Sequence, residues 1–169
     1  GRAGFKTNQI LAATGDTLAL ATIGNLNLGR AADISSNVLS QFNLEAEELG
    51  RVVDVISKTT TTANTNVEQF AEAMKFAGPT AASLGVSIEE TSAAIGVLGN
   101  SGLQGSLATR AFGSSLLRLT GANAKATKEM EKIGLVAFDT QGEFIGINKL
   151  IGELEKSYVG FTDEQKQAS

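Results

Sequence analysis

The sequence contains no cysteine, no histidine and no tryptophan, and it has only one proline and one tyrosine. Without cysteine the chain can form no disulfide, no thiolate nucleophile and no thiolate metal site. Without histidine it lacks the side chain that most readily transfers protons near neutral pH. Catalysis would have to depend on carboxylates. We therefore expect a protein that is not an enzyme and has no catalytic, cofactor-binding or metal-binding residues, and no cofactor.

Aromatic residues make up only 5% of the chain, although hydrophobic residues reach 42%. A core would therefore consist mainly of Ala, Leu, Ile and Val, which suits closely packed helices. The net charge is −4, and the 14 basic residues are scattered, so the basic surface that nucleic-acid binding requires is missing. No apolar run approaches the roughly 20 residues of a membrane span, so we expect neither nucleic acid nor membrane as a partner.

Apolar residues recur at intervals of three and four along most of the chain, which is the spacing of amphipathic helices. The fold class predicted is mainly α, a multi-helix domain of roughly eight to ten short helices packed as αα-hairpins, with one small β-hairpin near residues 135–145. Four regions are expected: a poorly defined N-terminal helical segment (1–26), a helical core (27–133), the β-hairpin (134–147) and truncated C-terminal helices (148–169).

The best-defined predicted features are corners between helices. Gly85 can adopt the left-handed conformation that closes a helix, and Asn43 is the corresponding residue of an earlier corner. Ser87 and Glu90 have the spacing of a capping box that begins the next helix. Further corners are expected at Gly102 and Gly134.

Helix starts and interruptions can also be predicted from local signals. Asn27 is an expected N-cap, and Thr65 to Glu68 matches a capping box. Gly15 predicts a break in the first helical segment. The β-branched run Thr59–Thr62 predicts an exposed loop, and Gly78-Pro79 predicts a kink or a restart of a helix.

In the predicted β-hairpin, Leu135 to Phe138 and Glu143 to Ile145 are the strands. Gly142 would supply the positive φ of the turn. Phe138 and Phe144 are expected to face the helices, because an isolated hairpin is only marginally stable.

Two helical stretches correspond at a constant offset of 42 residues, Leu28–Ile56 and Phe70–Leu98. The offset aligns Asn43 with Gly85, and it aligns Glu47-Glu48 with Glu89-Glu90. A duplicated αα-hairpin explains this correspondence, but so does the general similarity of amphipathic hairpins with similar corners. Both explanations stay open.

Three groups of residues have a functional interpretation beside a structural one. The pairs Glu47-Glu48 and Glu89-Glu90 could act as acid and base, but at helix starts they are expected to be caps. The glycine-rich link from Gly99 to Gly105, with Arg110 nearby, could bind an anion. It lacks the Lys-Ser/Thr pair of a phosphate loop, so an interhelical turn is favoured.

The third group is Asp139 to Gly142, which has some character of a calcium loop. It lacks oxygen ligands at alternate positions, so it is interpreted as a turn.

One long stretch resembles a known family. SLGVSIEETSAAIGVLGNSGLQGS, followed by an arginine-containing helix and then by IGLVAFDTQGEF, is similar to the core region of phage tail tape measure proteins. Two upstream segments are also similar to that family: AADISSNVLSQFNLEAEELGRVVDVISK and NTNVEQFAEAMKFAGPTAASLG. These are packing motifs, so their specificity lies in their order and spacing.

The resemblance implies a structural phage or prophage tail protein, the core domain of a tape measure protein that acts in tail assembly and tail length determination. It implies tail tube and tail assembly chaperone proteins as partners, with self-association as a further option. It also implies a place in the virion tail, after assembly in the bacterial host cytoplasm. Thr162 to Gln165 resembles the start of another helix, so we expect a fragment of a longer protein. The alternative is a helical repeat or adaptor domain that binds a protein partner.

Overall fold

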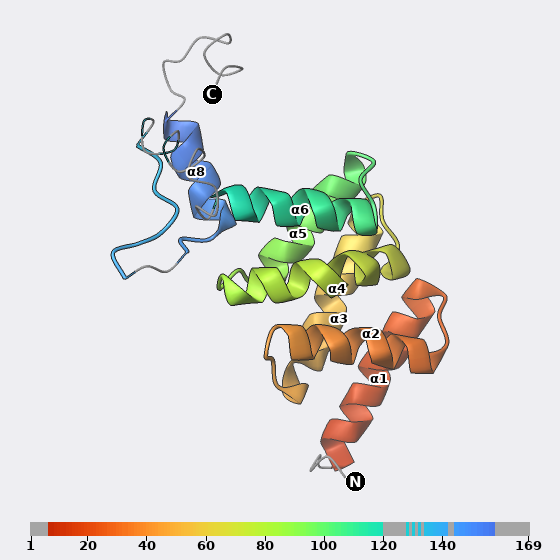
Figure 1. Ribbon diagram of the computed structural model, residues 1–169. Helices are drawn as coiled ribbons and strands as arrows, with labels where there is room; N and C mark the ends of the chain where they lie inside the picture. Colours follow the sequence, from red (N-terminus) through yellow and green to blue (C-terminus); the bar gives the residue numbers. More distant parts are fainter. Residues whose placement is uncertain are drawn as a thin grey trace.

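The computed structural model describes residues 7–119, 128, 130, 132, 134–141 and 144–157. Within these residues the fold is mainly α, which confirms the predicted class (Figure 1). The described helices are α1 (Thr7–Gly24), α2 (Leu28–Gln41), the short 3-10 helix η1 (Ala46–Glu48), α3 (Leu49–Thr62), α4 (Val67–Ser83), α5 (Ile88–Asn100), α6 (Ser106–Leu119) and α8 (Ile147–Ser157).

The first six α-helices form a two-layer stack of αα-hairpins. Helices α1, α3 and α5 pack side by side in one layer, and α2, α4 and α6 pack side by side in the other. Figure 1 shows α2, α4 and α6 one above another across the view, with α8 beyond the end of α6. Each hairpin therefore contacts mainly its neighbours in the stack, as in helical-repeat proteins.

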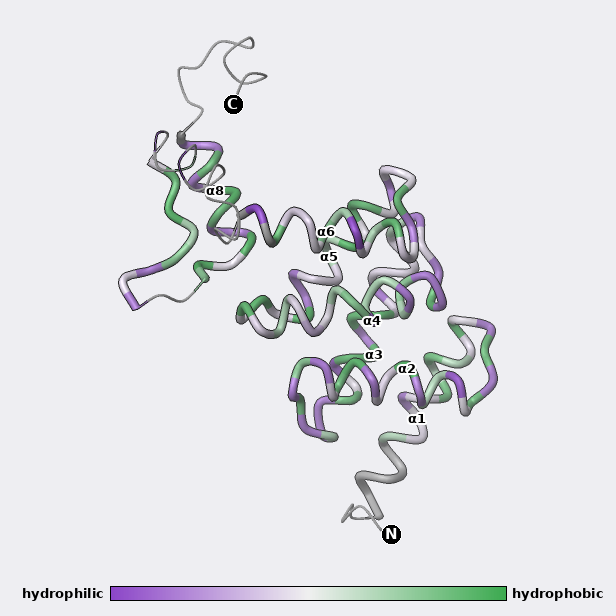
Figure 2. Tube along the Cα trace, viewed as in Figure 1, coloured by the Kyte–Doolittle hydropathy of each residue, from purple (hydrophilic) through white to green (hydrophobic). Residues whose placement is uncertain are grey.

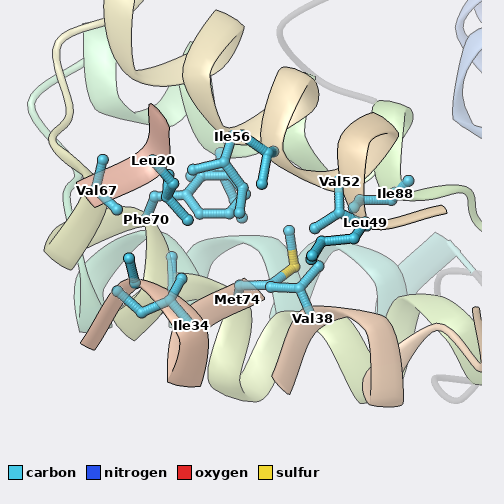
Figure 3. Close-up of a cluster of buried hydrophobic side chains, with 14 of the residues drawn as sticks. Leu20, Ile34, Val38, Leu49, Val52, Ile56, Val67, Phe70, Met74 and Ile88 are labelled. Atoms are coloured by element: carbon cyan, nitrogen blue, oxygen red, sulfur yellow. The ribbon is translucent and has the colours of Figure 1, made fainter. Parts of the chain in front are cut away.

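The core lies between the two layers, and Phe70 is fully buried within it. Figure 2 shows apolar and polar residues alternating along the helices, which is the pattern of helices with one buried face. Figure 3 shows apolar side chains from both layers meeting around Phe70. The residues labelled there are Leu20, Ile34, Val38, Leu49, Val52, Ile56, Val67, Phe70, Met74 and Ile88.

Helices α1, α2, α4 and α5 end in left-handed corners of one recurring type, and a fifth such corner lies at Gly134. A residue one or two positions beyond the helix has a positive φ, and the next residue, which is apolar, donates its N–H to a carbonyl five positions back. This is the Schellman motif, in which glycine or asparagine avoids the strain of the left-handed conformation. Its positive-φ residues are Asn25, Asn43, Gly85, Gly102 and Gly134.

The corners predicted at Asn43, Gly85, Gly102 and Gly134 are therefore confirmed. The corner at Asn25 was not predicted.

Two of the predicted helix starts are also confirmed. The Asn27 side chain accepts from the N–H of Arg30 at 2.9 Å. The Ser87 hydroxyl accepts from the N–H of Glu90 at 3.1 Å. The third start is shifted by one residue, because Asn66 rather than Thr65 caps α4 and Gln69 completes the box.

Three predicted breaks are wrong, because tertiary packing and local hydrogen bonds override weak helix formers. Helix α1 runs through Gly15 without interruption. Helix α3 includes the run Thr59–Thr62, whose four hydroxyls each donate to the carbonyl four residues earlier. Helix α4 continues through Gly78 and Pro79, so the helix does not restart there, while the kink stays a prediction. A Cβ at Gly78 would lie 2.5 Å from the Gln41 side-chain oxygen, so glycine serves helix packing there.

The predicted β-hairpin is not present as a sheet. The described residues of this region form only one isolated antiparallel bridge, between Phe138 and Phe144. Beside the bridge, the N–H of Ile145 donates to the carbonyl of Ala137 at 3.0 Å. Gly134 and Gly146, which flank this region, both have positive φ values, so the backbone leaves the extended conformation at both ends. The two phenylalanine rings are half-buried and meet edge to face, with centroids 6.0 Å apart. The predicted turn residue Gly142 lies outside the described residues.

Candidate functional site

An open groove runs between α3 and α5 on the outer face of their layer. Its volume is about 920 Å³. Residues of α3 and α5 line most of it, and Ile23 at the end of α1 adds to one wall. The lining residues are Ile23, Asp54, Val55, Ser57, Lys58, Thr59, Thr61, Thr62, Ala63, Glu89, Ser92, Ala93, Gly96, Val97 and Asn100.

Small side chains create this groove. A Cβ at Gly96 would lie 3.2 Å from the Cβ of Ala63 and 3.5 Å from Cγ2 of Thr59, so α3 and α5 approach closely there. The walls are formed by larger apolar side chains: Val97 is 66% exposed and Ile23 is 45% exposed. An apolar groove of this kind, lined over about three turns of helix, fits a protruding apolar side chain or a helix of a partner protein.

Two serine hydroxyls of the groove have no hydrogen-bond partner among the described residues. They are Oγ of Ser57 on α3 and Oγ of Ser92 on α5. Ser92 is only 1% exposed. Buried hydroxyl groups are normally paired, since an unpaired one costs about 1–3 kcal/mol. Both oxygens are buried, so they lie beneath the surface of the groove.

Arg51 closes one end of the groove by joining α3 to α5. Its guanidinium donates to both carboxylate oxygens of Glu89, at 2.7 and 2.9 Å, and to Glu48 at 2.6 Å. Hydrogen bonds to Glu89 and then Glu48 raise the pKa of Arg51, and the hydrogen bond from Arg51 lowers the pKa of Glu89. The side chains of Arg51, Glu89 and Glu48 are each between about one third and one half exposed. The ion pairs therefore orient α3 and α5 relative to each other more than they stabilise the fold.

A second ion pair in the other layer has the same spacing. Arg30 on α2 donates to the two carboxylate oxygens of Glu68 on α4, at 2.9 and 2.6 Å. In both layers the arginine and the glutamate that it joins across the stack are 38 residues apart in sequence. Sequence reasoning missed both pairs, although this shared spacing was a signal that could have revealed them.

The glycine-rich link forms the other end of the groove, where it binds the turn between α3 and α4. The side chain of Asn100 accepts from the N–H of Asn64 at 2.7 Å, and the Gln104 amide donates to the Asn64 carbonyl at 2.6 Å. A Cβ at Gly99 would lie 2.8 Å from that carbonyl oxygen. The link is the turn between α5 and α6, and Asn100 and Gln104 are committed to holding Asn64.

The paired acids lie at helix starts, as expected. Glu48 accepts from the N–H of Glu45 at 3.2 Å. Glu90 accepts from the N–H of Ser87 at 3.4 Å, and its other oxygen accepts from the Asn148 side chain at 3.2 Å. Glu90 therefore tethers the start of α8 to the start of α5, a contact that sequence reasoning also missed.

The remaining predicted positions lie apart from the groove. Asp139 accepts from the N–H of Gln141 at 2.9 Å, which is a local turn interaction. Among the described residues, no three side chains of the metal-binding types come together. The described helices include none with the length and apolar character needed to cross a membrane.

A family model described as phage-related minor tail protein matches residues 1–169. A protein named "Tape measure protein" from Pneumococcus phage Dp-1 is 32% identical over 164 residues, which cover 97% of this chain. The chain spans only 14% of the length of that relative. No solved structure matches the chain.

Proposed function

Because this chain belongs to the family of phage-related minor tail proteins, we propose that it is a folded helical module of a tape measure protein. It acts in tail assembly and in tail length determination, and it catalyses no reaction. Its partners are tail tube and tail assembly chaperone proteins. It is assembled in the host cytoplasm and remains in the virion tail. The division into regions 1–26, 27–133, 134–147 and 148–169 is part of the same proposal.

The observation that supports a contact role is the folding back of the helices. Fully helical, the 169 residues would span about 250 Å at roughly 1.5 Å per residue. The longest described helix has 18 residues, or about 27 Å by the same rise. Among the described helices, left-handed corners follow α1, α2, α4 and α5. A module folded in this way contributes little to length, so it serves tail length determination through contacts at one stage of assembly.

Electron microscopy of a phage whose parent gene lacks this segment in frame tests the proposal. The expected result is that tails are absent or misassembled, because the contacts made by the module are lost. The matched control removes a segment of equal length elsewhere in the parent, predicted to be extended helix, and should give intact but shorter tails. Intact tails shortened by about 250 Å after deletion of this module would mean that it acts as an extended ruler.

A second candidate function is supported by the stack of αα-hairpins and its groove, which are features of helical adaptor domains. On this account the chain binds a protein partner outside tail assembly. Affinity capture with the purified chain separates the two functions. Recovery of tail tube or tail chaperone proteins supports the first, and recovery of a host regulatory protein without tail proteins supports the second.

A further inference from the structure

We propose that the groove between α3 and α5 binds the exposed face of α4 on a second copy of this chain, with Phe76 as the inserted side chain. The proposal extends the assembly role above by naming one partner and one interface. It depends on two surfaces that the fold leaves uncovered, and on the charges beside them.

Phe76 is the inserted group because it is unusually exposed. It is 54% exposed, whereas Phe70 and Phe112 are buried. Among the described phenylalanines it alone has more than half of its surface in solvent. The Lys75 ammonium lies 5.5 Å from the centre of its ring. An exposed aromatic side chain with a cation beside it is typical of the anchor residues of protein interfaces.

The groove suits a large apolar side chain. Its walls expose Val97 and Ile23, which would be covered by an apolar group. The hydroxyl oxygens of Ser57 and Ser92 are buried beneath its floor, out of reach of a bound side chain. A phenylalanine ring has the apolar area needed to cover both walls.

The charges beside the two surfaces are complementary when the helices run antiparallel. On α3, exposed Asp54 and Lys58 are one turn apart at the rim of the groove. On α4, exposed Glu72 and Lys75 are about one turn apart next to Phe76. An antiparallel α4 would place Lys75 opposite Asp54 and Glu72 opposite Lys58. The parallel arrangement would bring like charges together, so the charges select the antiparallel one.

The two surfaces lie on opposite layers of the stack. The groove is formed by the layer of α1, α3 and α5, and Phe76 is on the layer of α2, α4 and α6 (Figure 1). Contact between them is therefore heterologous, since a different surface of each copy takes part. Heterologous contacts produce rings or open chains and not two-fold dimers.

Sedimentation velocity with the 169-residue chain tests the proposal. Over chain concentrations from about 1 to 300 µM, the range of weak protein association, we expect species larger than dimers to form. Phe76→Ser and Val97→Asp should each weaken association by at least about 30-fold, as expected for a central interface residue. Val136→Ser is the matched control, since Val136 is 63% exposed but lies outside both surfaces. It should associate like the parent sequence. Circular dichroism checks that each variant is folded.

Mixing the two variants gives the sharpest result. Phe76→Ser keeps an intact groove and Val97→Asp keeps an intact Phe76, so an equimolar mixture should form a one-to-one dimer and stop there. Asp54→Lys should weaken association, and Lys75→Glu in the same chain should restore it. A parent chain that stays monomeric, variants that associate normally, or a mixture that stays monomeric would each overturn the proposal. These results would leave the tail-assembly role standing, because the deletion experiment tests that role independently.

Discussion

Replacing Gly99 by alanine tests whether the close contact between α5 and the turn after α3 holds the stack together. An added Cβ would lie 2.8 Å from the carbonyl oxygen of Asn64 and 3.5 Å from the Cβ of Thr65. The first distance is too short for any real contact, and the obstacle is backbone, which cannot rotate away. The turn must move, and its hydrogen bonds with Asn100 and Gln104 must lengthen.

Two effects of opposite sign determine how much Gly99→Ala changes the free energy of unfolding. Alanine in a helix interior is favoured over glycine by about 1 kcal/mol. Overpacking costs about 1–3 kcal/mol, and each weakened hydrogen bond costs about 0.5–1.5 kcal/mol more. Steric conflict and hydrogen-bond loss therefore exceed the helix propensity gain, and the expected net destabilisation is about 1–5 kcal/mol.

Thermal unfolding followed by circular dichroism measures the effect, with about 2–4 °C expected per kcal/mol for a chain of this size. The matched control is Gly113→Ala in α6, where an added Cβ meets nothing within 4 Å. Only the helix propensity gain applies there, so this variant should unfold at a higher temperature than the parent chain. If Gly99→Ala stabilises the chain as Gly113→Ala does, the close contact does not exist.

Three further predictions follow from the corners, the aromatic pair and the ion pairs. Gly85 has φ of +71°, so Gly85→Val should lower the free energy of unfolding, measured by chemical denaturation, by about 1–3 kcal/mol, and Gly85→Asn should lower it much less. Equal unfolding midpoints of the two variants would contradict a left-handed corner. Phe144 packs half-buried against the end of the stack, so Phe144→Ala should cost about 1–3 kcal/mol, less than a fully buried ring, and no measurable loss would mean that this contact is absent. Arg51 lowers the pKa of Glu89 from 4.5, so their contribution is present above that pH and is lost as the pH falls through the lowered value. The melting temperature of the parent chain should therefore fall more steeply in acid than that of Arg51→Gln, and parallel pH profiles would refute this linkage.

The corners could be predicted from the sequence because their signals are local. A left-handed residue followed by an apolar one is recognisable without knowing what lies nearby, and Asn43 and Gly85 both fit this pattern. The lengths of the helices could not be predicted so well. Thr59 stays helical because it is buried against the stack and its hydroxyl bonds to the carbonyl of Val55. Helix propensity alone contains neither fact.

The groove could not be predicted, because it depends on how two helices that are distant in sequence approach each other. Gly96 and Ala93 suggest only that some helix packs closely against α5. That α3 is this helix follows from contacts of Gly96 with Ala63 and Thr59. The predicted β-hairpin failed for a related reason. Alternating apolar residues around Phe138 and Phe144 indicate a buried face, and the structure buries it through an edge-to-face ring contact instead of a ladder.

The structure bears on the question that the 42-residue offset left open. The corners at Asn43 and Gly85 are 42 residues apart. The caps at Asn27 and Asn66 are 39 residues apart, and the two ion pairs, Arg30–Glu68 and Arg51–Glu89, are displaced from each other by 21 residues. A duplication with one fixed offset would place all three features at the same interval, so both explanations stay open. A repeat can extend only if its end face is apolar. Helix α2 exposes polar and apolar side chains together: Asp33 and Ser36 are in solvent, and Leu28 is 47% exposed. The contact role proposed above therefore rests on the folding back of the helices and not on closure of the stack.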